Sequence, residues 1–304
     1  MLVGFNMDQA CTLLGYSRQA YYKTQVNKSG MASAALQIML PDLIKARRGN
    51  PTKGCRAIFD EYGQEWPMGR DWSINLLLEV GYRVKYPKHY RKATQSGNRE
   101  FPNLLVNLEL TCINQVWQAD MAYYLCSDKP FYTIYITDVY SQEIVAYGAY
   151  STNLAINYAE VLSQAIRVQR RFTDGLSQLI HHSDGGKQYE SVVYKQLCQK
   201  HGIRQSMCMY SYENPYAEKT NDLINNGYLN VWRPRTLKEL KTKQRLAVID
   251  HNSHSRKKVL GNRTPLAFKA LLLSREVDTI GYTLKLKPAA PEQPKNKQLY
   301  LNRN

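Results

Sequence analysis

The sequence predicts an α/β protein in which a layered core follows a smaller helical N-terminal region. Three observations lead to this prediction. Residues 35–82 show the apolar spacing of helices, residues 131–150 are rich in β-branched and aromatic residues, and residues 151–230 alternate between helix and strand patterns. Paired strands followed by alternating helices and strands are typical of a sheet covered by helices, with antiparallel strands first.

Length and charge limit the class of protein. A chain of 304 residues is long enough for a buried core and for two or more domains. The net charge of +16 and the pI near 9.5 favour a polyanionic partner, nucleic acid first, over a basic protein without such a partner. The six cysteines form no C-x-x-C pair, which argues against a zinc knuckle or a disulfide framework. No apolar run approaches the ~20 residues of a membrane span, and we expect a cytoplasmic protein.

The first segment, residues 1–30, contains a candidate helix-turn-helix. Residues 8–23 read as two short helices around Gly15, with Ser17 as the N-cap of the second helix. In such a unit the second helix enters a DNA groove. An ordinary helical hairpin explains the pattern equally well. The residues that the second helix would offer to DNA begin with Arg18 and Gln19.

A second helical region, residues 31–92, resembles another helix-turn-helix or winged DNA-binding unit. Pro41 is expected to start or break a helix, because proline lacks the amide hydrogen that a helix interior needs. The last part of this second region overlaps a basic segment, residues 83–103. This segment can follow a phosphate backbone or serve as a solvated linker. Residues 93–113 are the predicted linker to the core. The basic residues of the segment that are predicted to contact DNA are the first five, Arg83, Lys85, Lys88, Arg91 and Lys92.

The predicted core comprises residues 114–275, and a basic, proline-containing tail of residues 276–304 follows it. Within the core the patterns alternate in a regular order. The tail, rich in proline and polar residues, is expected to be disordered. The expected elements are a hairpin at 131–150, a helix at 157–172, a strand at 176–182, a helix at 191–202 closed by Gly202, a strand at 203–207, and a helix capped by Asn214 with Pro215 at its first position.

Three acids of this core are candidates for one metal site. Asp120 lies at the expected start of the first core strand, Asp184 follows a later strand, and Glu218 lies in the first turn of the last helix. Carboxylates at strand exits and a helix start can converge, and buried like charges of this kind need bound cations. Their hard oxygen ligands suit Mg²⁺ or Mn²⁺. Taken singly, each acid is explained by an ordinary strand-end, turn or helix-start role. Gly185 and Gly186 would leave space for a phosphate beside Asp184.

The stretches "VWQADMAYY", "LIHHSDGGKQYES" and "YENPYAEKTN" resemble the three signature blocks of DDE transposases with a retroviral-integrase-like core. The resemblance is greatest to the second reading-frame product of IS-three family insertion sequences, and it covers residues from about 8 to 270. The spacing between the last two acids, 218 − 184 = 34, also fits that family.

The resemblance implies a fold, a reaction and partners. The fold is an RNase H-like core with a mixed five-stranded sheet, and the catalytic, metal-binding residues are Asp120, Asp184 and Glu218. Two Mg²⁺ or Mn²⁺ ions would support hydrolysis and then 3′-hydroxyl attack at the terminal inverted repeats. The partners would be double-stranded DNA at the element ends and at the target, further copies of the chain on that DNA, and the upstream reading-frame product. The protein would act on the nucleoid in a bacterial cytoplasm.

Further residues near the acids have predicted roles. Lys187 and Lys219 are expected to contact phosphates. Helical spacing places 218, 221, 222 and 225 on one face, so the last helix would offer Asn221, Asp222 and Asn225 to DNA. Asp138 is interpreted as a hairpin residue, His181 and His182 as structural, one packed and one near the phosphate, and His251 and His254 as surface residues.

Two rival functions fit the same sequence. One is a catalytically inactive, transposase-derived DNA-binding protein that keeps the fold and the basic segment. The other is an RNase H-type nuclease that cuts but does not join.

Overall fold

The computed structural model describes residues 17–84, 99–126, 129–172, 176–274 and 283–286. Contacts divide the chain into two units, Met1–Pro87 and Lys88–Asn304. Each unit has its own buried core and is described by itself. Within the described residues, no helix combines the length and apolar character that crossing a membrane requires.

The first unit is helical. It contains α2 (Arg18–Gly49), α3 (Cys55–Tyr62), the 3₁₀ turn η1 (Gly63–Glu65) and α4 (Arg70–Glu79). Their packing confirms the helical pattern of residues 35–82. The core residues include Met39, Leu43, Ile58, Trp66 and Leu77.

Helix α2 departs from the sequence prediction at Pro41. The prediction that Pro41 starts or breaks a helix is wrong, because α2 runs through it for 32 residues. Buried Met39 and Leu43 lie on either side of it, so core packing on both sides compensates for the missing backbone hydrogen bond. The helix begins directly after Ser17 and spans both predicted N-terminal segments. The first helix of the candidate helix-turn-helix, before Ser17, lies outside the described residues.

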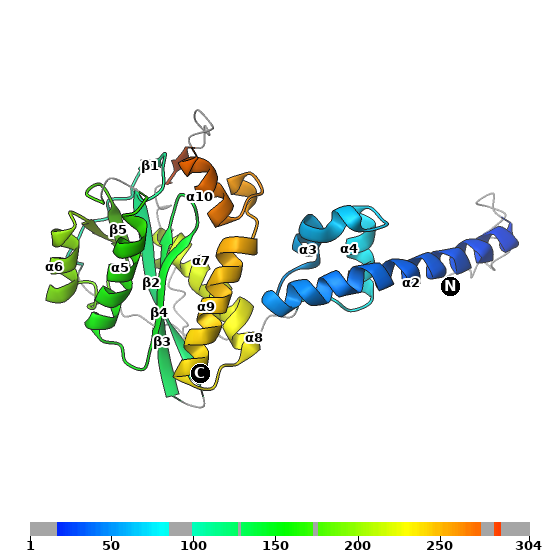
Figure 1. Cartoon of the computed structure of the whole chain (residues 1–304), viewed down its shortest axis with the longest axis horizontal. Helices are drawn as coiled ribbons and strands as arrows, with labels where there is room; N and C mark the ends of the chain where they lie inside the picture. Colours follow the sequence, from blue (N-terminus) through cyan, green and yellow to red (C-terminus); the bar gives the residue numbers. More distant parts are fainter. Residues whose placement is uncertain (1–16, 85–98, 127–128, 173–175, 275–282, 287–304) are drawn as a thin grey trace, which may run out of the picture. The chain divides into compact units, whose positions relative to one another are not determined.

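The second unit is built on a mixed five-stranded sheet in the order β4-β3-β2-β5-β6 (Figure 1). Strands β2, β3 and β4 are antiparallel, while β2–β5 and β5–β6 are parallel pairs. This topology confirms the predicted α/β sheet with antiparallel strands first. The strands are β2 (Val116–Cys126), β3 (Lys129–Asp138), β4 (Ile144–Tyr150), β5 (Ile180–Ser183) and β6 (Arg204–Met207).

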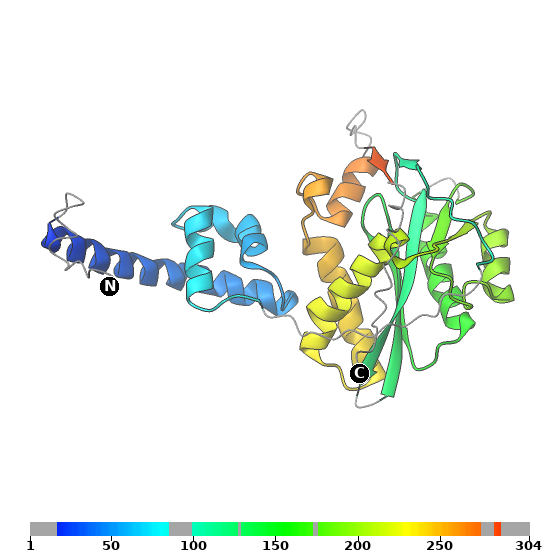
Figure 2. The same cartoon turned by 180° about the vertical axis from the view of Figure 1, so that it is seen from behind.

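Helices cover both faces of this sheet (Figures 1 and 2). One face packs against α5 (Ala155–Gln169) and α6 (Val192–Lys200), and the other against α7 (Pro215–Ile224) and α9 (Leu237–His254). Alternation along β3 makes this possible. Ile134 and Ile136 enter the core on the α5 side, and Tyr135 enters the core on the α9 side.

Shorter elements complete the second unit. Strand β1 pairs with β7 in a separate antiparallel ladder. His251 of α9 is buried with its Nε2 3.1 Å from the Gln142 carbonyl, so its prediction as a surface residue is wrong, whereas His254 is exposed. The elements are β1 (Glu109–Leu110), η2 (Ser211–Glu213), the π-helical turn η3 (Asn225–Leu229), α8 (Asn230–Trp232), η4 (Lys258–Leu260), α10 (Pro265–Leu273) and β7 (Leu284–Lys285).

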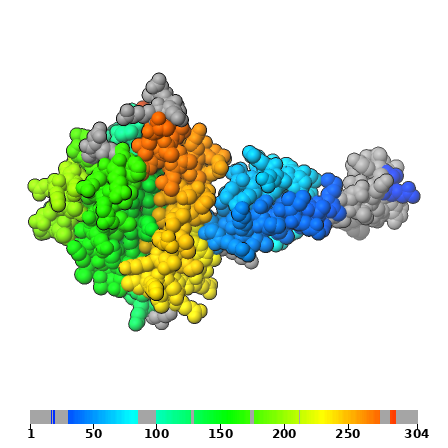
Figure 3. Space-filling model, in the orientation of Figure 1, coloured from blue at the N-terminus to red at the C-terminus, as the bar shows by residue number. Residues whose placement is uncertain are grey.

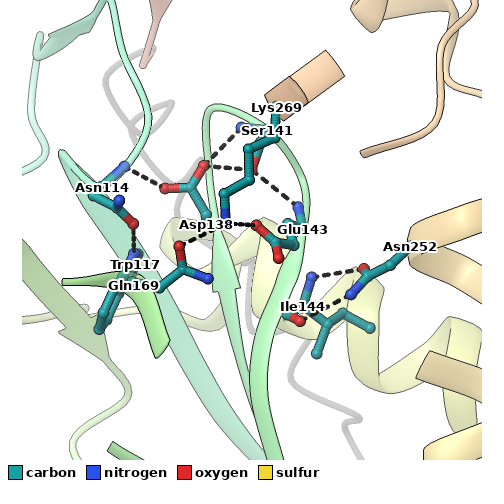
Figure 4. Close-up of polar contacts among 9 residues, drawn as sticks. All are labelled: Asn114, Trp117, Asp138, Ser141, Glu143, Ile144, Gln169, Asn252 and Lys269. Atoms are coloured by element: carbon teal, nitrogen blue, oxygen red, sulfur yellow. Dashed lines mark hydrogen bonds and ion pairs between the residues drawn. The ribbon is translucent and has the colours of Figure 1, made fainter. Parts of the chain in front are cut away.

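Helix α10 is fastened to the sheet by a buried ion pair (Figure 4). Lys269 Nζ lies 2.8 Å from Glu143 Oε2, and it donates to Gln169 Oε1 at 2.7 Å. The ring of Phe172 lies under the same ammonium group, with its centroid 4.2 Å from Nζ. A buried charge needs such partners, so Lys269 links α10, the β3–β4 turn and the end of α5.

Candidate active site

Strands β2 and β5 bring Asp120 and Asp184 to neighbouring positions. The two strands are parallel with Ala119 opposite Ser183, and each acid is the next residue along its strand. Asp184 directly follows β5, as predicted. Asp120 is not at the start of its strand, because β2 continues to Cys126 through its antiparallel pairing with β3.

Helix α7 brings Glu218 to the same place. Asn214 and Pro215 occupy the predicted N-cap and first positions, and Glu218 lies in the first turn with an exposed side chain. The Asn214 side chain makes no cap hydrogen bond. Its Nδ2 instead donates to the Ala119 carbonyl at 3.0 Å. The Gln118 side chain accepts from the first free amides of α7, so the helix start is fixed to β2 beside Asp120.

The next turn of α7 supports Asp120 directly. Asn221 Nδ2 donates to Asp120 Oδ2 at 2.7 Å. Asn221 and Asn225 are buried and Asp222 is exposed, so the prediction that all three face DNA is wrong for both asparagines. The reason is the docking of α7 on β2, which the helical spacing alone does not reveal. The spacing itself changes at Asn225, where η3 begins.

The surroundings oppose ionisation of both aspartates. Burial, and then the charge of Asp184, raise the pKa of Asp120 to about 7, and Glu218 adds to this effect. Hydrogen bonds from the Met121 amide, at 2.8 Å, and from Asn221 act in the opposite direction. Burial also raises the pKa of Asp184, against the amide of Gly186 and the charge of Arg99. The three acids are therefore close enough to interact electrostatically.

Arg99, which the sequence analysis did not single out, joins the loops that follow β5 and β6. Its Nη2 donates to the Met209 carbonyl at 2.6 Å and its Nε donates to the Cys208 carbonyl. A Cβ on Gly185 would lie 3.3 Å from the Arg99 Cγ, so the space expected for a phosphate there holds the arginine. A Cβ on Gly186 would lie 3.0 Å from Asp184 Oδ1, which accepts from the Gly186 amide at 3.1 Å. Glycine at 186 therefore allows that amide to approach the carboxylate.

His181 and His182 are structural, as predicted. Both side chains are buried, and burial lowers the pKa of His181 to about 3 and that of His182 to about 4. The Nε2 of His181 lies 3.0 Å from the Tyr194 hydroxyl, and the Nδ1 of His182 lies 2.8 Å from the Ser206 hydroxyl. The two rings are neutral packing groups behind Asp184, and the burial of both is at odds with the expectation that one contacts a phosphate.

Asp138 is confirmed as a hairpin residue (Figure 4). It ends β3, and its Oδ1 accepts from the amide and the hydroxyl of Ser141, both at 2.7 Å. Its Oδ2 accepts from the Asn114 amide at 2.7 Å. Burial raises its pKa to about 6. The chain's own donors thus bind both oxygens and give Asp138 a structural role.

The predicted DNA contacts are spread over both units. Gln19 and Arg83 are exposed in the first unit. Lys187 is exposed and lies 2.6 Å from Glu190 Oε2, while Lys219 is exposed on α7. The remaining candidates lie outside the described residues, or have side chains outside them, and they are Arg18, Lys85, Lys88, Arg91 and Lys92.

The three carboxylates do not lie close enough together to bind one ion jointly. Among the residues that the structure describes, no three His, Cys, Asp or Glu side chains lie close enough together to hold a metal ion. The donor set nevertheless fits one. Asp120, Asp184 and Glu218 offer hard oxygen ligands, and a divalent cation would offset the mutual repulsion that raises the pKa of Asp120.

Comparison with known proteins points to the part of the chain that contains Asp120 and Asp184. The integrase core domain family matches residues 111–210, which include Asp120 and Asp184. The insertion element IS600 31 kDa protein of Shigella sonnei is 30% identical over 267 residues, covering 85% of this chain and 97% of that protein. The IS629 transposase of the same organism is 30% identical over 158 residues, covering 50% of each chain. A putative IS986/IS6110 transposase of Mycobacterium tuberculosis is 30% identical over 125 residues, covering 40% of this chain and 45% of that protein.

Solved structures with similar folds include retroviral proteins. The HTLV-2 integrase catalytic core domain in complex with magnesium is 18% identical, with a TM-score of 0.40, and covers 55% of this chain and 99% of that one. An intasome chain of simian T-cell lymphotropic virus is 13% identical, with a TM-score of 0.46, and covers 82% of this chain and 75% of that one. The core has the RNase H-like fold of integrases. With 30% identity across almost all of the IS600 protein and an integrase core domain at its centre, the chain belongs to the IS-three family of insertion-sequence transposases.

Proposed function

We propose that this chain cuts insertion-sequence ends and joins them to target DNA by phosphoryl transfer, using Asp120, Asp184 and Glu218 as metal-binding catalytic residues. The observation that carries the proposal is the placement of Asp120 and Asp184 on neighbouring parallel strands, with Glu218 in the first turn of the helix that is hydrogen-bonded to β2 beside Asp120. Membership of the transposase family supports the same reaction.

The three acids would hold two Mg²⁺ or Mn²⁺ ions, which when bound supply an activated nucleophile and stabilise the leaving oxygen. The protein's own part is positioning. Asn221 orients Asp120 through its hydrogen bond, and the Gly186 amide orients Asp184. Arg99 fixes the loop beside Asp184 to the segment that leads into α7. A water molecule would be the first nucleophile, and the freed 3′-hydroxyl would be the second.

The proposed substrates are double-stranded DNA at the terminal inverted repeats and at the target. The net charge of +16 supports a phosphate-rich partner. Lys187 and Lys219, exposed next to two of the acids in the sequence, would contact phosphates near the reacting bond. We further propose that several copies assemble on the DNA together with the upstream reading-frame product, on the nucleoid in a bacterial cytoplasm.

The test is strand transfer with pre-cut end DNA in Mg²⁺, comparing the wild-type chain with Asp184→Asn. We expect the variant to lose joining by at least about a thousandfold, since removing one metal ligand disables the positioning that carries the rate. Glu109→Gln, which changes an exposed acid of β1 that has no predicted role at the site or in DNA binding, is the matched control and should join normally.

The outcomes also separate the rival functions. Equal joining by wild type and Asp184→Asn would disprove the metal-site proposal. A wild-type chain that binds DNA but neither cuts nor joins would be the inactive DNA-binding protein. Cutting of uncut ends without joining of pre-cut ends would identify a nuclease.

A further inference from the structure

A stripe of positive charge lies on α9, outside the site of the three acids. Lys238, Lys241 and Arg245 follow helical spacing along one flank of α9, and all three are exposed. Arg233 and Arg235, just before α9, are also exposed and continue the run. We call these five residues the α9 basic stripe. Figure 3 shows the segment as a yellow to orange band on the surface of the core.

The fold fixes the direction in which the stripe points. On its buried side, α9 is tied to the edge strand β4 at two places. Gln244 Nε2 donates to the Gly148 carbonyl at 3.0 Å. The Asn252 side chain pairs with both the amide and the carbonyl of Ile144, each at 3.0 Å. These contacts set the rotation and register of α9 on the sheet, so the stripe is held at the surface by rigid structure.

The acid within this segment is already engaged. Glu239 Oε2 accepts from the Arg235 amide at 2.8 Å, and the Glu239 amide donates to the Thr236 hydroxyl at 3.1 Å, an arrangement that caps α9. Within the described part of the chain, no side chain of the stripe forms an ion pair. Lys241 Nζ lies 5.7 Å from the centroid of the Tyr150 ring, which supports the lysine without neutralising it. With the five cations of the stripe and the single carboxylate of Glu239, the segment keeps a net positive charge for an external anion.

The stripe is also separate from the reacting centre. Helix α9 packs on β4, and β3 lies between β4 and the strand that carries Asp120. The stripe therefore lies about two strand spacings, about 10 Å, to the side of the strand that carries Asp120. The exposed apolar residue Ile249 lies one turn beyond Arg245 on the same flank, so the basic run ends at Arg245.

We propose that the α9 basic stripe binds the phosphate backbone of duplex DNA away from the reacting bond, without contacting bases. The proposal rests on the proposed function, since it assigns a second DNA surface to the same enzyme. From 238 to 245 the helix rises about 10 Å, and phosphates of one strand advance about 3.4 Å along the duplex. Four successive phosphates of one strand span about 10 Å, so the three cations can reach phosphates within a stretch of about four nucleotides.

The test is binding of a mixed-sequence duplex to the full chain in EDTA, followed by fluorescence anisotropy over a range of salt. The variant is Lys238→Gln/Lys241→Gln/Arg245→Gln. Each lost phosphate contact lowers the slope of log affinity against log salt by about 0.9, and three lower it by about 2.7. Between 50 and 200 mM salt, wild-type affinity should therefore fall about forty-fold more than that of the variant.

A matched control removes the same charge from the other covering layer. Arg167→Gln/Arg170→Gln/Lys200→Gln changes three exposed residues, in α5, at its C-cap and in α6, and both triples take the net charge from +16 to +13. The slope of log affinity against log salt should change in the control by less than about 0.9, the value for one phosphate contact. Lys238→Arg/Lys241→Arg should keep the wild-type slope, and circular dichroism should show all variants folded.

Equal slopes for the two triples would overturn the proposal, because binding would then follow net charge alone. An unchanged slope in the stripe variant would overturn it as well. Neither result depends on catalysis, since no metal is present. Failure of the proposed function would appear separately, as unchanged joining by Asp184→Asn.

Discussion

Replacing Asn221 with leucine tests how the chain controls ionisation of Asp120. Asn221 donates to Asp120 Oδ2 at 2.7 Å, and this bond lowers a pKa that burial and the Asp184 charge raise to about 7. Leucine is close to asparagine in size and favours a helix, so the change removes the donor with little effect on packing. A hydrogen bond to a charged group is worth ~1.5–3 kcal/mol, which corresponds to an increase of about one to two pH units in the pKa of Asp120.

The assay is the Mg²⁺ requirement for joining pre-cut ends, measured as a function of pH. A carboxylate must lose its proton to bind a cation, so below the pKa of Asp120 the Mg²⁺ concentration needed for half-maximal joining rises about tenfold per pH unit. We expect this rise to begin near pH 7 in the wild type and near pH 8 to 9 in Asn221→Leu. Glu109→Gln should match the wild type. A folded Asn221→Leu protein whose Mg²⁺ requirement begins to rise at the wild-type pH would refute the reasoning.

Three further predictions concern other contacts. Arg99→Gln should reduce joining about tenfold or more without unfolding the chain, because the guanidinium holds the loop beside Asp184 and opposes the increase in its pKa; unchanged joining rates would exclude this role. Lys269→Met should lower the free energy of unfolding by about 3–5 kcal/mol because it leaves Glu143 buried and unpaired, and adding Glu143→Leu should restore most of it in urea unfolding. Burial lowers the pKa of His251 from 6.5 to about 3, so the unfolded chain takes up its proton first as the pH falls. Wild-type stability should therefore fall between pH 6.5 and 3 by up to about 1.4 kcal/mol per pH unit more than that of His251→Gln, and equal pH dependence in urea would contradict this.

The sequence predicted correctly those elements whose own residues determine their conformation. The β3–β4 hairpin follows from its β-branched and aromatic residues, and the end of α6 follows from Gly202, whose φ of +67° suits glycine. Pro41 shows the opposite case. A local rule predicted a helix break, and packing of apolar residues on both sides of the proline outweighed it. Such packing depends on α3 and α4, which a local window does not include.

The site was predictable in its acids and not in the residues that support them. Asp120, Asp184 and Glu218 were predicted from their joint appearance at expected strand ends and a helix start and from the resemblance to DDE transposases. Asn221 contacts an acid 101 residues earlier in the chain, and Arg99 contacts a carbonyl 109 residues later. Contacts at this separation depend on how α7 and the 208–209 segment dock against the sheet, and neither leaves a spacing pattern in the sequence.

Acids near strand ends look alike in the sequence, and the hydrogen-bond donors around them distinguish their roles. Asp138 receives three donors on its two oxygens, so the chain itself satisfies that carboxylate. Asp184 receives the Gly186 amide on one oxygen, and Asp120 receives one donor on each oxygen, yet burial, Asp184 and Glu218 still raise the pKa of Asp120 to about 7. An acid that its own chain satisfies has little to gain from a cation, whereas an acid beside two other acids gains a great deal. For this reason Asp138→Asn should weaken folding and Asp184→Asn should weaken metal-dependent joining, and an exchange of these two effects would mean that the site has been assigned to the wrong acids.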